Sequence, residues 1–230
     1  MKKFLAIAVI TMVPSLALAG IQGSKHDLTD SNNAVYSTAT GAELCKFCHI
    51  PHNARTDSAA LWNRNDPGTT TLAYSDNTTV AGTVLPATMG GPSLRCFTCH
   101  DGSSNIGVTY ASGTFTMLGA NQTSGALNGN SSADVSRAEM NGNHPISVAY
   151  GDGSVYNSTT GTTSGYNAAS GLSSAKIYGS ANAYGVECGS CHEPHDTQYG
   201  SFLRADNSSS GLCLDCHNRS EERRVGKECR

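Results

Sequence analysis

Apolar residues are gathered at the N-terminal end of the chain. Residues 4–18 are mostly apolar, follow two lysines and end in Ala-Leu-Ala. A basic start, a short apolar run and small residues at this spacing predict a secretory signal peptide over residues 1–19, cut before Gly20. Pro14 interrupts the run, which is short for a membrane span; a retained N-terminal anchor is the alternative. The mature protein is therefore expected to be exported.

After residue 20 the hydrophobic pattern is weak. No second apolar stretch is long enough to cross a membrane, and residues 101–187 are rich in Gly, Ser, Thr and Asn without a helical period. We expect these polar segments to be loops with a few short strands. The predicted fold class is mainly irregular coil with a few short helices. Helices are predicted only around the cysteines, over residues 42–49, 93–100, 186–192 and 211–217.

The last twelve residues, 219–230, differ in composition from the rest of the chain. They read RSEERRVGKECR and are charged, whereas the preceding chain is rich in Ser, Thr, Asn and Gly. Translation of a common short-read sequencing adapter yields the same twelve residues in the same order. We therefore interpret them as an artefact tail and exclude them from fold reasoning. Cys229 then no longer counts among the cysteines of the domain.

Without its two ends the chain is acidic and poor in apolar side chains. The full chain has a formal net charge of −3, but eight Lys/Arg and fifteen Asp/Glu remain after the ends are removed, about −7 in total. This charge makes nucleic acid an unfavourable partner. With one Trp and five Phe in 230 residues, side chains alone supply little core. The chain is then either largely disordered or built around something other than its side chains.

The remaining eight cysteines form four pairs of identical spacing, each followed at once by a histidine. This Cys-x-x-Cys-His motif attaches c-type haem: the cysteines form thioethers with the two vinyl groups of the porphyrin, and the histidine binds the iron. The sequence therefore predicts four covalently bound haem c groups, which form a stacked core for a tetrahaem cytochrome domain over residues 20–218. The motifs are Cys45, Cys48 and His49; Cys96, Cys99 and His100; Cys188, Cys191 and His192; and Cys213, Cys216 and His217.

Other uses of paired cysteines explain the pattern less well. Zinc sites account for the pairs but not for the histidine after all four of them. A disulfide within each pair suits an exported protein, yet it would close a loop too short to stabilise much. Redox pairs of the thioredoxin type need a βαβ context that the sequence does not contain.

Four histidines remain once the four proximal ligands are assigned, and four haems need four distal ligands. We therefore predict that two histidines ligate every iron, with the pairing unassigned. Full ligation leaves no iron position for a substrate, which predicts an electron carrier without catalytic residues. A reductase with one open haem is the alternative, and carbon monoxide binding would reveal it. The remaining histidines are His26, His52, His144 and His195, and the competing methionines are Met89, Met117 and Met140.

His52 and His195 each lie three residues after a proximal histidine, with a proline between. On a helix, residues three apart point to the same side. His52 therefore cannot reach the far face of the ring that His49 holds, and it serves a different haem or stays free. The same argument applies to His195 and His192. One turn that carries ligands for two irons would hold two haems close together.

The Cys-x-x-Cys-His-x-Pro-His stretches at residues 45–52 and 188–195 resemble those of multihaem cytochromes exported by metal-reducing bacteria. The signal peptide, the loop-rich chain and the spare histidines are similar to the filament-forming cytochromes of the OmcE and OmcS type. The resemblance implies a coil fold with a continuous haem chain, and self-assembly into filaments in which a histidine of one subunit completes a haem of its neighbour. His52 matches that position, and His26 is the alternative.

Two functions follow from the resemblance and the export signal. The chain is expected to be a filament subunit at the outer cell surface that passes electrons to redox partner proteins or extracellular acceptors. A discrete tetrahaem shuttle in the periplasm is the alternative. The preference for the filament rests on analogy of layout rather than on physical argument.

Overall fold

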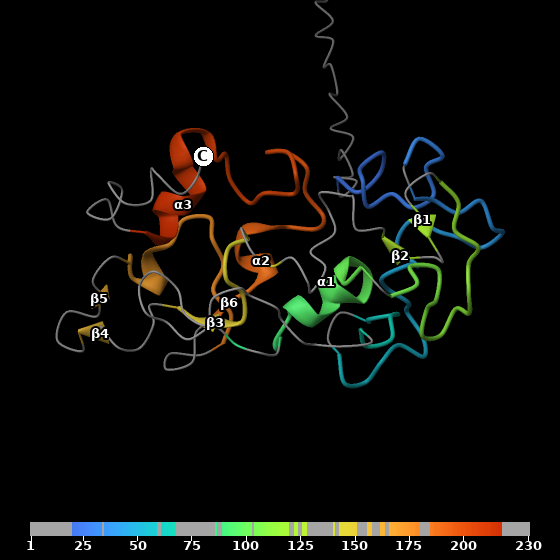
Figure 1. The fold of residues 1–230 in the computed structure, drawn as a ribbon, viewed down its shortest axis with the longest axis horizontal. Coiled ribbons are helices and arrows are strands. Elements are labelled where there is room, and N and C mark those ends of the chain that lie inside the picture. The colour runs from blue at the N-terminus through green and yellow to red at the C-terminus, as the bar shows by residue number, and fades with distance from the viewer. Residues whose placement is uncertain are drawn as a thin grey trace, which may run out of the picture.

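Turns and irregular loops make up most of the part of the chain that the structure describes (Figure 1). The structure is a computed structural model. It describes residues 20–33, 35–58, 61–67, 86, 89–102, 104–119, 122–123, 126–127, 140, 143–150, 156–157, 162–163, 166–179 and 185–217. The predicted signal peptide (1–19) and the predicted tail (219–230), with Asn218 and Cys229, lie outside the described residues. Among the described residues, no helix is both long and apolar enough for a membrane span.

Three short α-helices coincide with three of the four cysteine motifs. They are α1 (Ser93–His100), α2 (Cys188–Cys191) and α3 (Gly211–Cys216), and two 3₁₀ turns, η1 (Ala169–Gly171) and η2 (Ser208–Ser210), accompany them. Apolar residues at the (i, i+3) positions Leu94 and Phe97 give α1 a buried side. Just beyond its C-cap lies Gly102, with a φ of 69° that favours glycine. The helices predicted over 93–100, 186–192 and 211–217 are thus confirmed, within one or two residues at their ends.

The helix predicted over residues 42–49 is wrong, because this motif forms only a hydrogen-bonded turn. Lys46 N–H donates to the Glu43 carbonyl at 2.9 Å and His49 N–H to the Cys45 carbonyl at 2.8 Å. Beyond that turn Ile50 N–H pairs with the Leu61 carbonyl at 2.9 Å, so the chain continues as extended backbone. A single turn of helix is marginal by itself, and pairing with the downstream segment competes with its extension.

Among the described residues, the named strands form three antiparallel pairs of two residues each. The pairs are β1 (Gln122–Thr123) with β2 (Ala126–Leu127), β4 (Tyr156–Asn157) with β5 (Thr162–Thr163), and β3 (Val148–Ala149) with β6 (Gly185–Val186). The first two close locally, whereas β3 and β6 join segments far apart in sequence. The β3–β6 pair lies next to α2, to which β6 leads (Figure 1). This agrees with the prediction of few and short strands.

Two small apolar clusters support the motifs. The first contains Phe47 and Phe115 with ring centroids 5.1 Å apart, and Cys48 and Cys99 pack against it. The second contains Phe97, and Leu94 and Cys188 pack against it. The three methionines considered as distal ligands are all buried in these clusters, Met117 in the first and Met89 and Met140 in the second. Their side chains therefore serve as packing.

Gly107 makes a close backbone approach that forms part of the first cluster's wall. A Cβ at this position would lie 2.0 Å from the Phe115 carbonyl oxygen, and Phe115 N–H donates to the Gly107 carbonyl at 2.9 Å. Gly107→Ala is therefore expected to lose about 1–3 kcal/mol of stability, seen as a melting temperature several degrees lower by circular dichroism. Gly171→Ala, whose Cβ meets nothing within 4 Å, should melt as the wild type. Equal melting of both variants would contradict the close approach.

Candidate functional site

All four motifs share the same backbone turn. In each, the histidine N–H reaches back to the carbonyl of the first cysteine, which is one turn of α-helix and sets both cysteines and the histidine on one side. In the second motif this turn is the end of α1. The other three bonds measure 2.8 Å for His49 to Cys45, 3.1 Å for His192 to Cys188 and 2.9 Å for His217 to Cys213. This is the local geometry that two thioethers and one axial ligand to a single porphyrin require.

Three of the four proximal histidines leave this turn as extended backbone and pair with another segment. His192 has φ −109° and ψ 140°, and His217 has φ −94° and ψ 133°. Isolated bridges join His49 to Trp62, His192 to Leu203 and His217 to Tyr166. The backbone of these three histidines is thus fixed from both sides, which orients their rings.

Neighbouring motifs contact each other in chain order. Burial first, and then the neighbouring Cys99 thiol, raises the pKa of Cys48 to about 12, so the first and second motifs adjoin. The Cys96 thiol donates to Cys188, which raises the pKa of Cys96 and lowers that of Cys188. Burial and then Cys213 raise the pKa of Cys191, so the third motif adjoins the fourth. The four attachment sites therefore form one continuous row.

A buried carboxyl group ties α1 to α2 at the centre of this row. Glu187 accepts hydrogen bonds from the hydroxyls of Ser93 and Ser147, and it forms a capping box with Ser190 at the start of α2. The Ser93 hydroxyl in turn accepts from the Cys188 N–H at 2.9 Å. Burial raises the pKa of Glu187 above its usual value, and the hydroxyl donors oppose this. The second and third motifs are thus held in register by side chains of both helices.

Three histidine pairs have ring separations that suit one iron between them. The centroids lie 6.1 Å apart for His26 and His100, 6.0 Å for His49 and His195, and 6.3 Å for His144 and His217. Two imidazoles on opposite sides of one metal ion have centroids about 6 Å apart, since each metal–nitrogen bond is about 2 Å long and each centroid lies about 1 Å behind its nitrogen. Each pair combines one proximal histidine with one of the spare histidines, so these residues fit a bis-histidine haem.

Hydrogen bonds to Nδ1 leave Nε2 of four histidines available for a metal. Carbonyl and carboxylate oxygens only accept, so Nδ1 carries the hydrogen and Nε2 keeps its lone pair. Such partners orient metal-binding histidines and increase their basicity. The partners are the Pro194 carbonyl for His26 (3.4 Å), the Pro145 carbonyl for His144 (2.8 Å), the Ser201 carbonyl for His192 (2.9 Å) and Glu193 Oε1 for His195 (3.1 Å).

His26 lies near histidines of the second and third motifs. Burial, followed by the nearby His100, lowers its pKa to about 4, and His195 and His192 add to this effect. A low pKa keeps the ring neutral, which is the form that binds a metal. The Phe202 ring stacks on His26, with centroids 4.1 Å apart and planes 18° apart. His26, near the start of the described residues, therefore lies close to the second and third motifs.

His52 and His192 are not brought together. Both are exposed, and no histidine ring pairs with either of them among the described residues. His52 follows Pro51 in a bend, and His192 lies beyond the end of α2. In both stretches the helical turn ends before the second histidine. The His195 ring lies beside His49 of another motif, and ligation of two irons from one stretch stays a prediction.

Aromatic neighbours of the histidines were not predicted. Trp62 packs edge-on against His49 with centroids 5.6 Å apart, and Tyr166 lies 4.9 Å from His217. Phe202 fills the same role for His26. Trp62 is the single tryptophan of the chain, which was a usable signal, whereas Tyr166 and Phe202 lie in polar segments without a motif. Their rings limit how far each histidine can rotate.

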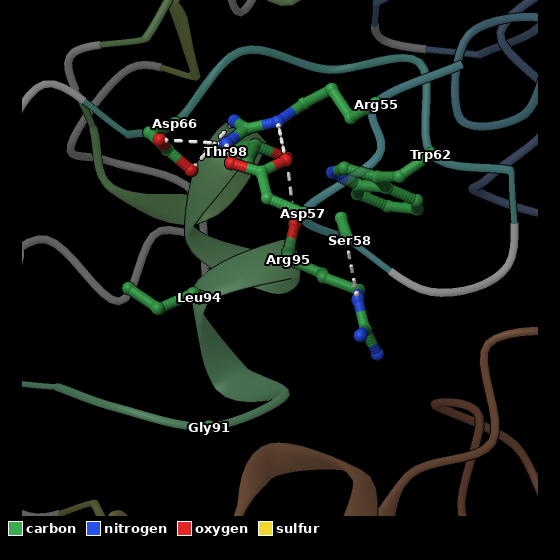
Figure 2. A pocket seen from close by; sticks show the side chains of 9 residues that line it. All are labelled: Arg55, Asp57, Ser58, Trp62, Asp66, Gly91, Leu94, Arg95 and Thr98. Carbon is green, nitrogen blue, oxygen red and sulfur yellow. Dashed lines mark hydrogen bonds and ion pairs between the residues drawn. The ribbon is translucent and has the colours of Figure 1, made fainter.

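A polar cavity of about 260 Å³ lies between α1 and the segment at residues 55–66 (Figure 2). Arg55 lines it and pairs with both Asp57 and Asp66, which raises the pKa of the guanidinium; the hydrogen bond from Arg55 in turn lowers the pKa of Asp57. Arg95 donates from Nε to the Ser58 hydroxyl at 3.2 Å. The Arg55 charge is thus satisfied within the wall, and the cavity is smaller than most ligand pockets.

Asp215 anchors the fourth motif to the loop at residues 173–175. Its carboxylate accepts the N–H groups of Ser173, Ser174 and Ala175, at 2.6–2.8 Å, and the Ser173 hydroxyl at 2.9 Å. Burial would raise its pKa, but these donors lower the pKa below the usual value of 3.8. The stabilisation is therefore present above pH 4 and is lost as pH falls through the lowered pKa.

Asp215→Asn is expected to cost about 1–3 kcal/mol at pH 7, because the charged acceptor is lost and an amide donor faces N–H groups. The variant should also lose less stability than the wild type when acidified. Denaturant titrations at pH 7 and pH 3 measure both effects. Asp206→Asn, at an exposed turn where the donors are those of Ser208, is the control and should change little at pH 7. Similar losses in both variants would contradict an anchoring role.

None of the eight motif cysteines forms a disulfide in the described part of the chain. Within the described ranges, no three His, Cys, Asp or Glu side chains are placed to hold a metal ion by themselves. A family model described as the doubled CXXCH motif matches residues 181–222, which contain the third and fourth motifs. A comparison with curated proteins finds no match to the chain. The doubled motif indicates covalently bound c-type haem and supports a multihaem c-type cytochrome that carries electrons.

Proposed function

We propose that this protein conducts electrons along four covalently bound haem c groups, each ligated by two histidines. The observation that carries the proposal is the row of four attachment turns: Cys48 and Cys99 pack against one apolar cluster, Cys188 packs against the cluster of Phe97 in the second motif, and Cys191 is close enough to Cys213 for its pKa to be raised. Each haem would supply an iron that changes oxidation state. The chain's own residues attach the haems, ligate their irons and keep neighbouring haems in contact, which is what rapid transfer between them needs.

The ring separations support a pairing for three of the four haems. His49 and His195 would ligate the first haem, His100 and His26 the second, and His217 and His144 the fourth. Because His195 belongs to the third motif, it would also connect the first haem to the third. The three methionines are buried in the apolar clusters, which favours histidine over methionine as the distal ligand.

The fourth pairing is proposed to form between subunits. His192 would hold the third haem, and His52 is the one spare histidine outside the three pairs. His52 is exposed, so it is accessible to a second copy of the chain. His52 of one subunit completing the third haem of the next would extend the haem row indefinitely. Such a contact would build a filament at the outer cell surface, which redox partner proteins reduce and extracellular acceptors oxidise.

A reductase is the second candidate. It is favoured by the same observation, that no histidine ring pairs with His192 among the described residues. If no neighbour supplies His52, the third haem of a separate chain has one open iron position. Such an iron can bind a small molecule, whereas the other three haems cannot.

The experiment is to express the chain with its signal peptide in a bacterium that matures c-type cytochromes. Haem per polypeptide is measured first, with four expected, and cell-surface shearings are then examined by electron microscopy. Filaments that contain this chain and do not bind carbon monoxide support the proposal. A haem-loaded monomer that stays in the periplasm would end the filament proposal and leave a shuttle, and a monomer with one carbon monoxide site would favour the reductase. A haem-free, folded protein would overturn electron transfer altogether.

A further inference from the structure

Arg64 is a buried cation whose partners are all neutral. Arg64 is only 2% exposed. Nη1 donates to the Ile106 carbonyl, and Nη2 donates to the carbonyls of Thr98 and Asn105, at 3.0 and 3.1 Å. Backbone carbonyls satisfy the hydrogen-bonding capacity of these nitrogens but not the charge.

The remaining nitrogen, Nε, lacks a partner altogether. It is the one fully buried side-chain nitrogen or oxygen without a hydrogen bond among the described residues. Arg55 and Arg204 are ion-paired with carboxylates in the described part of the chain, but no such pair includes Arg64. Burial of a guanidinium without a counter-charge costs several kcal/mol, and an unmade hydrogen bond adds to that. An anion that accepts from Nε would satisfy both this hydrogen and the charge.

The position of Arg64 indicates which anion this is. The preceding residue, Asn63, donates its N–H to the Cys48 carbonyl at 2.8 Å and its amide to the Lys46 carbonyl at 2.7 Å, so Arg64 directly follows a segment fixed to the first motif. The Thr98 carbonyl that Arg64 contacts lies in α1, inside the second motif. The cation thus sits between the first two attachment sites.

A haem c brings two propionate carboxylates into this region, and arginine is the side chain best suited to bind a carboxylate in a desolvated site. We propose that Arg64 is the buried partner of a propionate of the haem attached at Cys45 and Cys48, with Nε–H donating to the carboxylate. The positive charge stabilises the added electron, so Arg64 raises the reduction potential of that haem. Arg64 acts as a positioning residue. This inference rests on the proposed function, because it presupposes a haem on the first motif.

The test compares the reduction potentials of three holoprotein variants. Haem per polypeptide is measured first, since a wild-type protein without haem defeats the proposed function rather than this inference. In Arg64→Gln, the reduction potential of one haem should fall by about 59 mV. For one electron, this shifts the oxidised-to-reduced ratio of that haem about tenfold towards oxidised at a fixed applied potential. Arg64→Lys keeps the charge and should restore most of the potential. Arg55→Gln removes an arginine charge that two carboxylates already balance, and should leave all potentials near wild type.

Two outcomes overturn the inference. One is a shift in Arg64→Gln no larger than in Arg55→Gln; the other is an equal shift in Arg64→Gln and Arg64→Lys. If Arg64→Gln does not bind its haems, the inference is tested by comparing Arg64→Lys with the wild type. Infrared redox-difference spectra of wild type with ¹³C-labelled propionates should then show a carboxylate band that moves in Arg64→Lys. An unmoved band would contradict a propionate partner.

Discussion

Replacing Cys188 and Cys191 together by alanine is expected to remove one haem in four and to loosen the middle of the molecule. The third motif contacts the second, since Cys188 N–H donates to the Ser93 hydroxyl and Cys188 packs against the Phe97 cluster, and the Cys213 thiol is near enough to raise the pKa of Cys191. α2 is one turn long and cannot persist by itself. The apolar clusters are small, so the covalent haem is expected to supply much of the buried surface here. Haem per polypeptide should fall from four to three, with faster proteolysis around residues 185–203.

Cys229→Ala is the matched control for this prediction. Gly226 stands three residues before Cys229 and Arg230 directly after it, so this cysteine belongs to no Cys-x-x-Cys-His motif and its loss should change neither haem content nor protease resistance. A three-haem double variant that resists proteolysis as well as the wild type would contradict a haem-dependent fold. It would mean that the β3–β6 pair and the Glu187 contacts hold the centre without a porphyrin.

The local part of each site could be predicted from the sequence because it depends on residues within one turn. The bond from histidine N–H to cysteine carbonyl follows directly from the spacing of the motif. The helix expected at residues 42–49 failed because Ile50 pairs with Leu61, a contact that no local pattern encodes. Local propensity is a weak signal when a distant segment offers competing backbone partners.

The histidine pairs could be counted from the sequence but not assigned. The number of spare histidines equals the number of haems, which predicts two ligands for each iron. His49 and His195 are separated by 146 positions of mostly polar sequence, and a sequence of this composition carries no pattern that specifies which segments meet. Arg64 escaped notice for the same reason: an arginine in Asn-Arg-Asn looks exposed until its burial is known.

His195→Ala and His52→Ala are expected to differ in one decisive respect. His195 lies 6.0 Å from His49 inside the chain, so its loss should leave the first haem five-coordinate in every preparation, monomer or filament. The reduced variant should then bind one more carbon monoxide per chain than the wild type, and part of the absorption should become high-spin.

His52 has no ring partner within the described chain, so its loss should leave the spectrum of separated chains unchanged. In assembled protein, His52→Ala should open the third haem, add one carbon monoxide per subunit and reduce filament yield. Carbon monoxide titration of both variants before and after assembly measures the contrast. Identical behaviour of His52→Ala and wild type in filaments would contradict ligation between subunits, because the row would then continue without His52. A wild-type spectrum for His195→Ala would instead overturn the pairing within the chain.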